Sequence, residues 1–316
     1  MKNYNFFSIT EINDALRTDP KAFLDQCDEQ YHAKVERAAD LIAMRVSSCP
    51  IVLLSGPSGS GKTTTAMKIA EALQERGIRS QSLSMDNYYR TYNPKTSPKT
   101  PDGKDDLESP ECLDLDLLGE HLRALAAGKT IHQPLYNFAT RIQAGPIGKA
   151  MRLKDNEVAV CEGIHALNDE IFAHCPGAFR LYISARSNVA DEEGRMLFKG
   201  TWMRLMRRLV RDNNFRGTDA AGTLDMWANV RRGEKKYISP FKDRADLKFD
   251  TAFPCEVSVM KHYAEPLLAA LPDGAERHDE IRSILPALER FEDVDPALLS
   301  PESLLREFIG GGVYHY

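Results

Sequence analysis

Long apolar runs are absent from this chain of 316 residues, although 42% of its residues are hydrophobic. No stretch approaches the roughly 18 apolar residues that a membrane helix needs. The start, "MKNYNFFSITEINDAL", acquires acidic residues early and has no cationic region followed by an apolar one, so it does not fit a signal peptide. We therefore expect a soluble cytoplasmic protein with no membrane partner.

Cysteine motifs and a strong positive charge are missing as well. The six cysteines, at positions 27, 49, 112, 161, 175 and 255, form no Cys-x-x-Cys pair, and no group of histidines and cysteines has the spacing of a zinc site. We expect reduced thiols and no structural zinc. A formal net charge of −5 excludes a global basic field for nucleic acid, so any anion site must be local.

Apolar runs alternate with helical patterns along the middle of the chain. We expect a buried strand at 50–55, followed by a helix at 62–76 that ends at Gly77. Further strands are expected at 79–85, 157–163, 179–184 and 247–253, and further helices at 9–48, 114–127 and 201–212. This alternation predicts an α/β fold with a doubly wound parallel sheet. Residues 90–112 are expected to form a long loop, of the kind that is either functional or disordered.

The stretch "SGPSGSGKTT", residues 55–64, follows the first of these strands. It fits G-x-x-x-x-G-K-[ST] from Gly56 to Thr63. Glycines let the backbone curl so that its N–H groups face one point, and the following helix adds its positive N-terminal end. Lys62 can bridge the outer phosphates of a nucleoside triphosphate, and the Thr63 hydroxyl can ligate magnesium. The residues expected to bind ATP are Gly56, Ser58, Gly59, Ser60, Gly61, Lys62, Thr63 and Thr64.

Two features of other phosphate-loop proteins are absent. The Asn-Lys-x-Asp motif with which GTPase switches recognise their base does not occur. A motor ATPase usually ends a later strand with Asp-Glu, whereas the strand "VAVCEG" ends with a single carboxylate, Glu162, followed by glycine. This favours phosphoryl transfer to a bound acceptor over hydrolysis.

Two further groups fit such a transfer. Asp86 in "SMDNYYR" is expected at the carboxyl end of a parallel strand, where it can accept a proton from an attacking hydroxyl or hold magnesium through water. The helix expected at 201–212 carries four arginines at helical spacing, and a fifth follows on a loop: Arg204, Arg207, Arg208, Arg211 and Arg216. A solvated surface face is one interpretation. We favour a mobile lid that neutralises phosphoryl charge and excludes water on closing.

Together these residues resemble the uridine kinase/phosphoribulokinase family of P-loop kinases over roughly residues 50–270. The resemblance rests on "GPSGSGKTT", "SMDNYYR", "PLYNF", "CEGIHALN" and "RRLVRDNNFRG". "EGIHALN", "MWANVRRGEKKYISPF" and the terminal "LLREFIGG" are similar to a bacterial nucleoside kinase-like branch. Longer members of that branch carry an N-terminal module resembling part of threonyl-tRNA synthetase, which we expect this chain to lack.

The resemblance implies a role for each matching residue. The catalytic residues would be Asp86 as general base, Lys62, and the lid residues Arg211 and Arg216 near the phosphates. Magnesium would be held with the help of Thr63, Asp86 and Glu162. The residues that would meet the acceptor are Glu108, Tyr136, Arg141 and Arg208, with Tyr136 at its base and Arg208 near its ribose.

Three departures from the family pattern concern the acceptor and the lid. "YNFATR" has Asn137 and Arg141 where pyrimidine kinases of the family typically have aspartate and histidine, and arginine only donates hydrogen bonds. Glu108 stands where the family has an aspartate that contacts ribose. Thr218 follows "RG" where the lid often has a second arginine. The identity of the acceptor therefore stays open.

We expect three regions: a helical extension over 1–49, a kinase domain over 50–270 with a lid at about 201–220, and a helical extension with a tail over 271–316. The tail "FIGGGVYHY" is expected to dock, because Phe308 and Ile309 are costly to leave in water.

The expected reaction is ATP- and magnesium-dependent phosphorylation of the 5′-hydroxyl of a nucleoside, uridine or cytidine first. The alternatives are a kinase of another small hydroxyl compound, such as a sugar, a sugar phosphate or a modified nucleoside, and a regulatory module that binds ATP and transfers nothing. No nucleic-acid partner is expected, and a homo-oligomer stays open.

Overall fold

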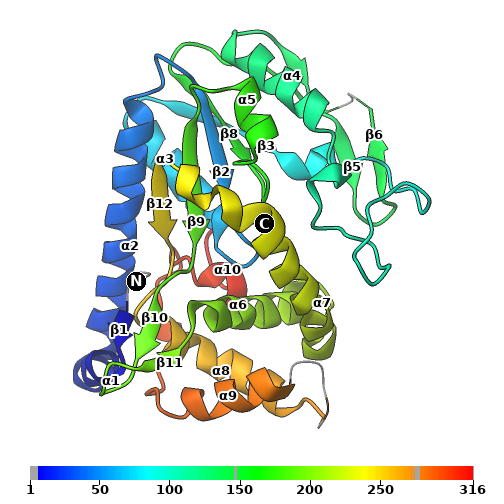
Figure 1. Ribbon diagram of the computed structural model, residues 1–316. Coiled ribbons are helices and arrows are strands. Elements are labelled where there is room, and N and C mark those ends of the chain that lie inside the picture. Colours follow the sequence, from blue (N-terminus) through cyan, green and yellow to red (C-terminus); the bar gives the residue numbers. More distant parts are fainter. Residues whose placement is uncertain (1–5, 146–147, 273, 275–277, 316) are drawn as a thin grey trace.

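A five-stranded parallel sheet forms the centre of the protein. The computed structural model describes residues 6–145, 148–272, 274 and 278–315 (Figure 1). The strands run in the spatial order β12 (Leu247–Asp250), β9 (Phe179–Ser184), β2 (Ile51–Ser55), β8 (Glu157–Glu162) and β3 (Arg79–Ser84), and every neighbouring pair is parallel. The α/β fold and all five strands predicted from the sequence are confirmed.

Successive residues of β2 point to opposite faces of the sheet, and each face has its own apolar core. Val52 and Leu54 belong to the core that includes residues of α2 (Pro20–Ala43) and α3 (Lys62–Glu75). Ile51 and Leu53 belong to the core that includes residues of α4 (Leu115–Ala126) and α5 (Asp169–His174). Figure 1 shows these helix pairs on opposite sides of the sheet. A continuous apolar strand such as "IVLL" is therefore explained by burial on both faces.

The N-terminal helices pack into the first of these cores. The predicted helix at 9–48 is two helices, α1 (Ile9–Thr18) and α2, because the chain turns at Asp19. The Ser8 hydroxyl caps α1 by accepting a hydrogen bond from Glu11 N at 3.4 Å, and the Asp19 carboxylate caps α2 in the same way, with Pro20 as its first residue. Ser8 also ends β1 (Phe6–Ser8), which joins β10 (Asn188–Ala190) and β11 (Met196–Phe198) in a small sheet.

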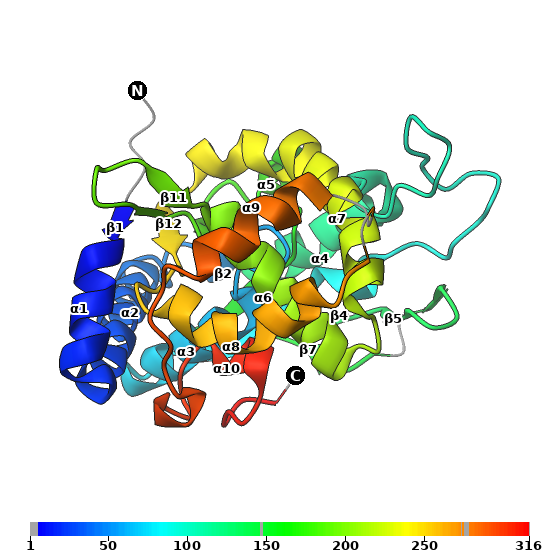
Figure 2. The same cartoon turned by 90° about the horizontal axis from the view of Figure 1, so that it is seen from below.

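A helical layer lies against the carboxyl edge of the central sheet. It contains α6 (Gly200–Phe215), α7 (Ala220–Gly233), α8 (Glu256–Ala269) and α9 (His278–Leu288), and Figure 2, which views the molecule from below, shows α8 and α9 in front of α6. A π-helical turn η3 (Glu234–Ile238) and the 3₁₀ turn η4 (Ser239–Arg244) connect α7 to β12. β12 ends three residues earlier than predicted because the Asp250 carboxylate accepts hydrogen bonds from Ala252 N and Arg186 N.

The basic helix predicted at 201–212 is α6, but its arginines do not all face solvent or a ligand. Arg204 and Arg207 are 2% and 0% exposed. Arg204 pairs with Glu234 at 2.7 Å, and Arg207 pairs with Glu256 at 2.6 Å. These two arginines therefore attach α6 to its neighbours. Both belong to the arginines that the sequence grouped as a lid, and this pair is engaged by carboxylates inside the protein.

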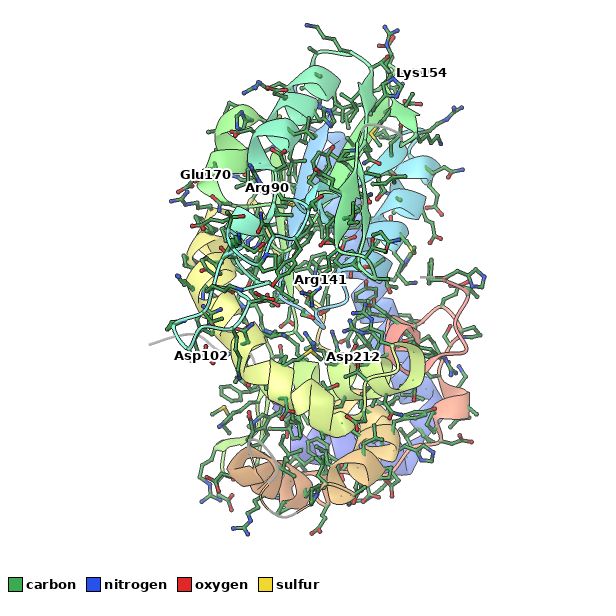
Figure 3. The ribbon with its side chains drawn as sticks, turned by 90° about the vertical axis from the view of Figure 1, so that its right-hand side faces the viewer. Arg90, Asp102, Arg141, Lys154, Glu170 and Asp212 are labelled. Carbon is green, nitrogen blue, oxygen red and sulfur yellow. The ribbon has the colours of Figure 1, made fainter. Side chains whose placement is uncertain are left out.

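Short elements and a long loop follow β3 in the chain. Residues 90–112 form the expected long loop, with the single-turn helix η2 (Pro110–Cys112) at its end. Figure 3 shows Asp102 of this loop at the outer edge of the molecule. Two small antiparallel strand pairs follow, β4 (Ile131–His132) with β7 (Ala150–Met151), and β5 (Leu135–Asn137) with β6 (Ile142–Ala144).

The described helices include none that combines the length and the apolar character needed to cross a membrane. All six cysteines are free thiols.

Candidate active site

The loop between β2 and α3 needs its glycines for geometric reasons. Gly59 and Gly61 have φ angles of 73° and 77°, which is the left-handed region that side chains disfavour. A Cβ atom on Gly56 would lie 2.0 Å from the carbonyl oxygen of Ile183 at the end of β9. The sequence "GPSGSG" thus folds into a tight loop at the N-terminus of α3.

Side chains from α6 and from the end of β12 hold this loop from outside. Arg204 Nε donates to Ser58 O at 3.2 Å, and Arg207 Nη1 donates to Gly59 O at 3.3 Å. Thr251 Oγ1 donates to Ser60 O at 2.7 Å. Because these carbonyl groups are engaged by outer partners, backbone N–H groups of the loop are left to face an anion on its inner side.

A cavity of about 900 Å³ opens on the inner side of the loop. Of the residues predicted to bind or act on ATP and magnesium, ten line it, and the list is Ser58, Gly59, Ser60, Gly61, Lys62, Thr63, Asp86, Glu162, Arg211 and Arg216. Gly56 and Thr64 do not line it, because Gly56 packs on β9 and Thr64 is buried in the first turn of α3.

Lys62 lies among carboxylates in this cavity. Burial lowers the pKa of the Lys62 ammonium, and the negative charges of Glu162, Glu307 and Asp86 oppose this shift. Its Nζ donates a long hydrogen bond to Pro57 O at 3.4 Å. The neighbouring Ser60 Oγ is buried and has no hydrogen-bond partner in the described part of the chain. A phosphate oxygen is the kind of group that satisfies both an ammonium and an orphan hydroxyl.

The two predicted magnesium carboxylates end adjacent strands. Ser84, the last residue of β3, is paired with Glu162, the last residue of β8, and Asp86 follows in η1 (Met85–Tyr88). Burial raises the pKa of Glu162, and partial desolvation raises that of Asp86, while the Lys62 charge lowers both. Thr63 Oγ1 donates to Glu162 Oε1 at 3.4 Å.

These oxygen atoms fit magnesium as a partial ligand set. No cluster of three or more potential metal-binding side chains (His, Cys, Asp or Glu) occurs among the described residues. Mg²⁺ is commonly held by one or two carboxylates with water and substrate phosphates, so Thr63 with Glu162 and Asp86 matches its preference.

The two lid arginines that line the cavity are bound to one aspartate of α6. Asp212, labelled in Figure 3, accepts a hydrogen bond from Arg211 Nη2 at 2.7 Å and lies 3.8 Å from Arg216 Nε. Arg216 is exposed, and Arg208 lies 3.4 Å from the same aspartate and donates to Ser58 Oγ at 2.9 Å. Arg211 and Arg216 line the cavity and can reach an anion there, whereas Arg208 does not line it.

The residues predicted to meet the acceptor lie beyond the cavity lining. Tyr136 packs with Tyr89 and Phe138, at ring-centre distances of 5.4 and 4.9 Å. The Tyr89 hydroxyl experiences the charges of both Asp86 and Glu108, so these carboxylates flank the aromatic group. Glu108 packs against Gly233 at the end of α7.

Burial raises the pKa of Glu108 to about 7, against the opposing charges of Arg208 and Lys62. Arg141 is engaged on the 90–112 loop, since its guanidinium lies 4.9 Å from the Tyr92 ring centre and 3.6 Å from Asp105. Arg141 therefore pairs with the 90–112 loop, and its predicted contact with the acceptor stays a prediction.

The structure adds a group of residues that sequence reasoning did not place in the site. Residues of α10 (Arg306–Ile309) and of the glycine run that follows line the cavity, including Glu307. Thr64 Oγ1 donates to Glu307 Oε2 at 2.5 Å. The sequence signals were the resemblance of "LLREFIGG" to the nucleoside kinase-like branch and the cost of exposing Phe308 and Ile309, which are indeed buried.

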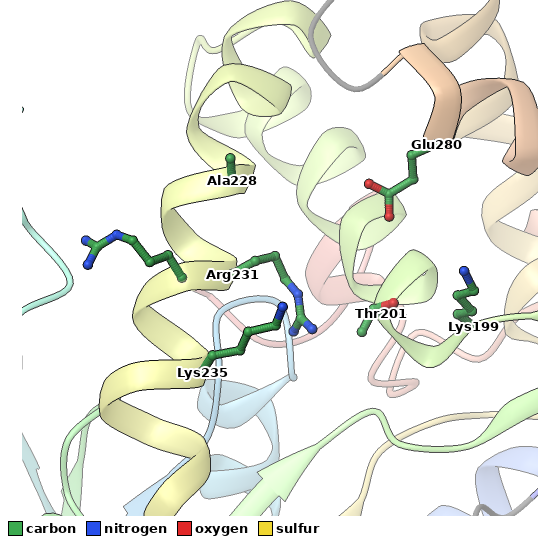
Figure 4. Close-up of a pocket in the computed structure, with 7 residues that line it drawn as sticks. Lys199, Thr201, Ala228, Arg231, Lys235 and Glu280 are labelled. Atoms are coloured by element: carbon green, nitrogen blue, oxygen red, sulfur yellow. The ribbon is translucent and has the colours of Figure 1, made fainter. Parts of the chain in front are cut away.

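A second cavity, of about 410 Å³, lies between α6, α7 and α9 (Figure 4). Its lining is Lys199, Thr201, Ala228, Arg231, Arg232, Lys235 and Glu280. None of the sequence-predicted site residues is among them, and its Arg231 is paired with Glu234.

Comparisons with known proteins single out one family for this chain. The profile of the phosphoribulokinase/uridine kinase family matches residues 51–257. A uridine kinase of Schizosaccharomyces pombe is 30% identical over 187 residues, which cover 59% of this chain and 35% of that protein. A uridine kinase of Borreliella burgdorferi is 30% identical over 201 residues, covering 62% of this chain and 84% of that protein. The solved structure of a kinase assigned to a fructose transport system in Silicibacter is 19% identical, with a TM-score of 0.48, and the match covers 68% of this chain and 98% of that one.

Proposed function

The chain belongs to the phosphoribulokinase/uridine kinase family, and from this we propose that it transfers the terminal phosphoryl group of ATP to the 5′-hydroxyl of a nucleoside, uridine or cytidine first. The observation that carries the proposal is the position of Asp86. It lies in the cavity with Lys62 and Glu162, at the carboxyl edge of the sheet and facing the phosphate loop. A carboxylate beside the phosphate site suits transfer to an acceptor held on its other side.

The donor side of the reaction uses the residues of the loop. Residues 58–63 would hold the phosphates of ATP, with Lys62 on the outer ones. Thr63, Glu162 and Asp86 would hold magnesium, which when bound neutralises phosphate charge and orients the transferring group. Arg211 and Arg216 would add positive charge on the α6 side of the cavity.

Asp86 would act on the acceptor. Its carboxylate accepts the proton of the attacking hydroxyl as the new oxygen–phosphorus bond forms and the bond to the departing ADP breaks. Its raised pKa makes it a better proton acceptor than an ordinary surface aspartate, because the basic strength of a carboxylate increases with its pKa. The relatives named uridine kinases support a nucleoside as the acceptor.

Glu108 gives the acceptor side a pH dependence. Since its pKa is raised to about 7, the side chain is protonated below pH 7 and becomes a carboxylate above it. A carboxylate can accept hydrogen bonds from two sugar hydroxyls, whereas the protonated acid accepts fewer. We expect kcat/KM for the acceptor to fall by up to about tenfold per pH unit below 7.

The measurement is a pH profile of kcat/KM for the wild type and for Glu108→Gln. The variant should have a low kcat/KM with no inflection near pH 7. An unchanged inflection in Glu108→Gln would assign the titration to another group.

A second candidate acceptor is a small hydroxyl compound other than a standard nucleoside. It is motivated by Arg141 and Glu108 at positions where the resemblance predicts histidine and aspartate. A third candidate, a regulatory module that binds ATP without transferring phosphate, has less support because Lys62, Asp86, Glu162 and both lid arginines line one cavity.

The test of the function is an ADP-release assay with ATP, magnesium and a panel of nucleosides, sugars and sugar phosphates. We expect turnover with uridine or cytidine above the background without acceptor. Turnover only with a sugar, a sugar phosphate or a modified nucleoside would support the second candidate. Tight ATP binding with no phosphorylated product from any compound would support the third.

A further inference from the structure

The second cavity, between α6, α7 and α9, has a cationic lining (Figure 4). Its volume of about 410 Å³ lies within the usual range of small-molecule sites. Four of its seven lining residues are lysine or arginine, and one, Glu280, is acidic. It shares no lining residue with the cavity of the phosphate loop, so the proposed phosphoryl transfer does not account for it.

Two of these four cations already have counter-charges inside the protein. Arg232 donates through Nη2 to the buried carboxylate of Asp106 at 2.6 Å. Arg231 donates through Nη1 to Glu234, which also accepts two hydrogen bonds from Arg204. These bonds fix the Arg231 guanidinium, whose Nε and Nη2 groups have no hydrogen-bond partner in the described part of the chain. Arg231 is therefore a positioned donor with N–H groups left for a ligand.

The other two cations have no counter-charge. Lys199 and Lys235 are exposed, and neither makes an ion pair within 4 Å among the residues that the structure describes. The Lys199 ammonium lies 4.7 Å from the ring centre of Trp202, which restricts its position at the cavity. Cations that line one cavity repel one another, so an anion bound among Arg231, Lys199 and Lys235 would relieve this repulsion.

A neutral donor completes the group. Figure 4 shows the side chains of Arg231 and Lys235 pointing toward Thr201. The Thr201 hydroxyl has no hydrogen-bond partner within the described ranges of the chain. Thr201 is also the second residue of α6, which begins without a side-chain cap, so the positive end of the helix dipole adds to the same field. A guanidinium, an ammonium and a hydroxyl are together suited to the oxygens of one phosphate group.

Glu280 of α9 limits the kind of ligand that fits. Its carboxylate accepts a hydrogen bond from Trp202 Nε1 at 3.0 Å, which holds it at the cavity. A carboxylate repels a second phosphate group in the same small space. It only accepts hydrogen bonds when ionised, and a hydroxyl group is a suitable donor. The lining therefore favours a compound with one phosphate and a hydroxyl-bearing body over a polyphosphate such as ATP.

We propose that the second cavity binds a phosphate monoester of a small hydroxylated compound, at a site separate from the candidate active site. Arg231, Lys235 and Thr201 would hold the phosphate, and Lys199 would add positive charge at the cavity. Glu280 would accept a hydrogen bond from a hydroxyl of the ligand. The site depends neither on the phosphoryl transfer proposed above nor on the identity of its acceptor.

The test is equilibrium binding of glycerol 3-phosphate to the full chain, followed by phosphorus NMR at a mildly alkaline pH, where phosphate groups are dianions. Magnesium and a non-hydrolysable ATP analogue fill the phosphate loop beforehand. We expect saturable binding that is tighter than that of inorganic phosphate. Lys235→Ala should raise the dissociation constant by about tenfold, the effect of losing one hydrogen bond to a charged group. Lys199→Ala combined with Lys235→Ala should remove saturable binding, and both lysines are exposed, so the fold should be retained.

Lys236→Ala is the matched control, because Lys236 is exposed on the same turn as Lys235 and does not line the cavity. It should keep the wild-type dissociation constant. The proposal is overturned by a wild type that shows no saturable binding, or by a Lys235→Ala variant that binds as tightly as the wild type. Inorganic phosphate that binds as tightly as glycerol 3-phosphate would also overturn it, since the hydroxyl contact with Glu280 would then contribute nothing. A chain that binds the probe but turns over no acceptor would refute the kinase function and leave this inference standing.

Discussion

Replacing Asp86 with asparagine is expected to lower kcat with the best acceptor by about 10²- to 10⁴-fold, the range that a general base contributes. The amide keeps the shape of the side chain and cannot accept the proton of the acceptor hydroxyl. Asp86 makes no hydrogen bond to the phosphate loop among the described residues, and the amide oxygen of asparagine can still face magnesium, so ATP should still bind. The loss should therefore appear in kcat, while the dissociation constant of ATP measured by calorimetry changes little.

Asp116→Asn is a suitable control for this experiment. Asp116 is exposed on α4, in the stretch "DLLG", which imitates a GTPase motif. The control variant should retain wild-type turnover. A kcat within a few-fold of the wild type in Asp86→Asn would contradict the proposed role of Asp86, whichever acceptor the enzyme uses.

Replacing Arg207 with methionine is expected to lower the free energy of unfolding by about 3–5 kcal/mol, the usual effect of removing one partner of a buried ion pair. The Arg207 and Glu256 side chains are both 0% exposed. The substitution leaves the Glu256 carboxylate without its main counter-charge in a low-dielectric interior. It also removes the hydrogen bonds to Thr251 O and Gly59 O. Urea-induced unfolding followed by circular dichroism would measure the change.

The double variant Arg207→Met with Glu256→Leu separates charge burial from packing. Replacing both partners by apolar residues removes the unpaired charge, so the double variant should recover a large part of the lost stability. If the two substitutions simply add, the destabilisation arises from lost packing under α6, and the ion-pair explanation is wrong. Arg216→Met is an exposed control and should change the stability by less than about 1 kcal/mol.

The arrangement of Asp86 and Glu162 was predictable because it follows from local patterns and one general rule. Asp86 comes just after β3 and Glu162 ends β8, and parallel strands place their carboxyl ends at one edge of a sheet. The register confirms this, since Ser84 and Glu162 are direct partners. The phosphate loop was predictable for a similar reason, because its glycines and lysine are consecutive and their conformations are set locally.

The arginines of α6 show where such reasoning stops. Their spacing predicted a helix, which the structure confirms over Gly200–Phe215. It did not indicate which of them are buried, because charged residues are rarely buried unless paired, and the partners are Glu234 and Glu256, 30 and 49 residues away.

The amino-acid sequence by itself determined the α/β sheet, the phosphate loop and the carboxylates at its edge, because hydrophobic period and glycine placement act over a few residues. Only the tertiary structure decided which arginines line the cavity and that residues of α10 and the glycines after it line it as well. Glu307 is 243 residues from Thr64 in the chain, and no local pattern connects them. Their contact depends on the burial of Leu304 and Phe308 against the loop, so the physical reason is the packing of the whole domain.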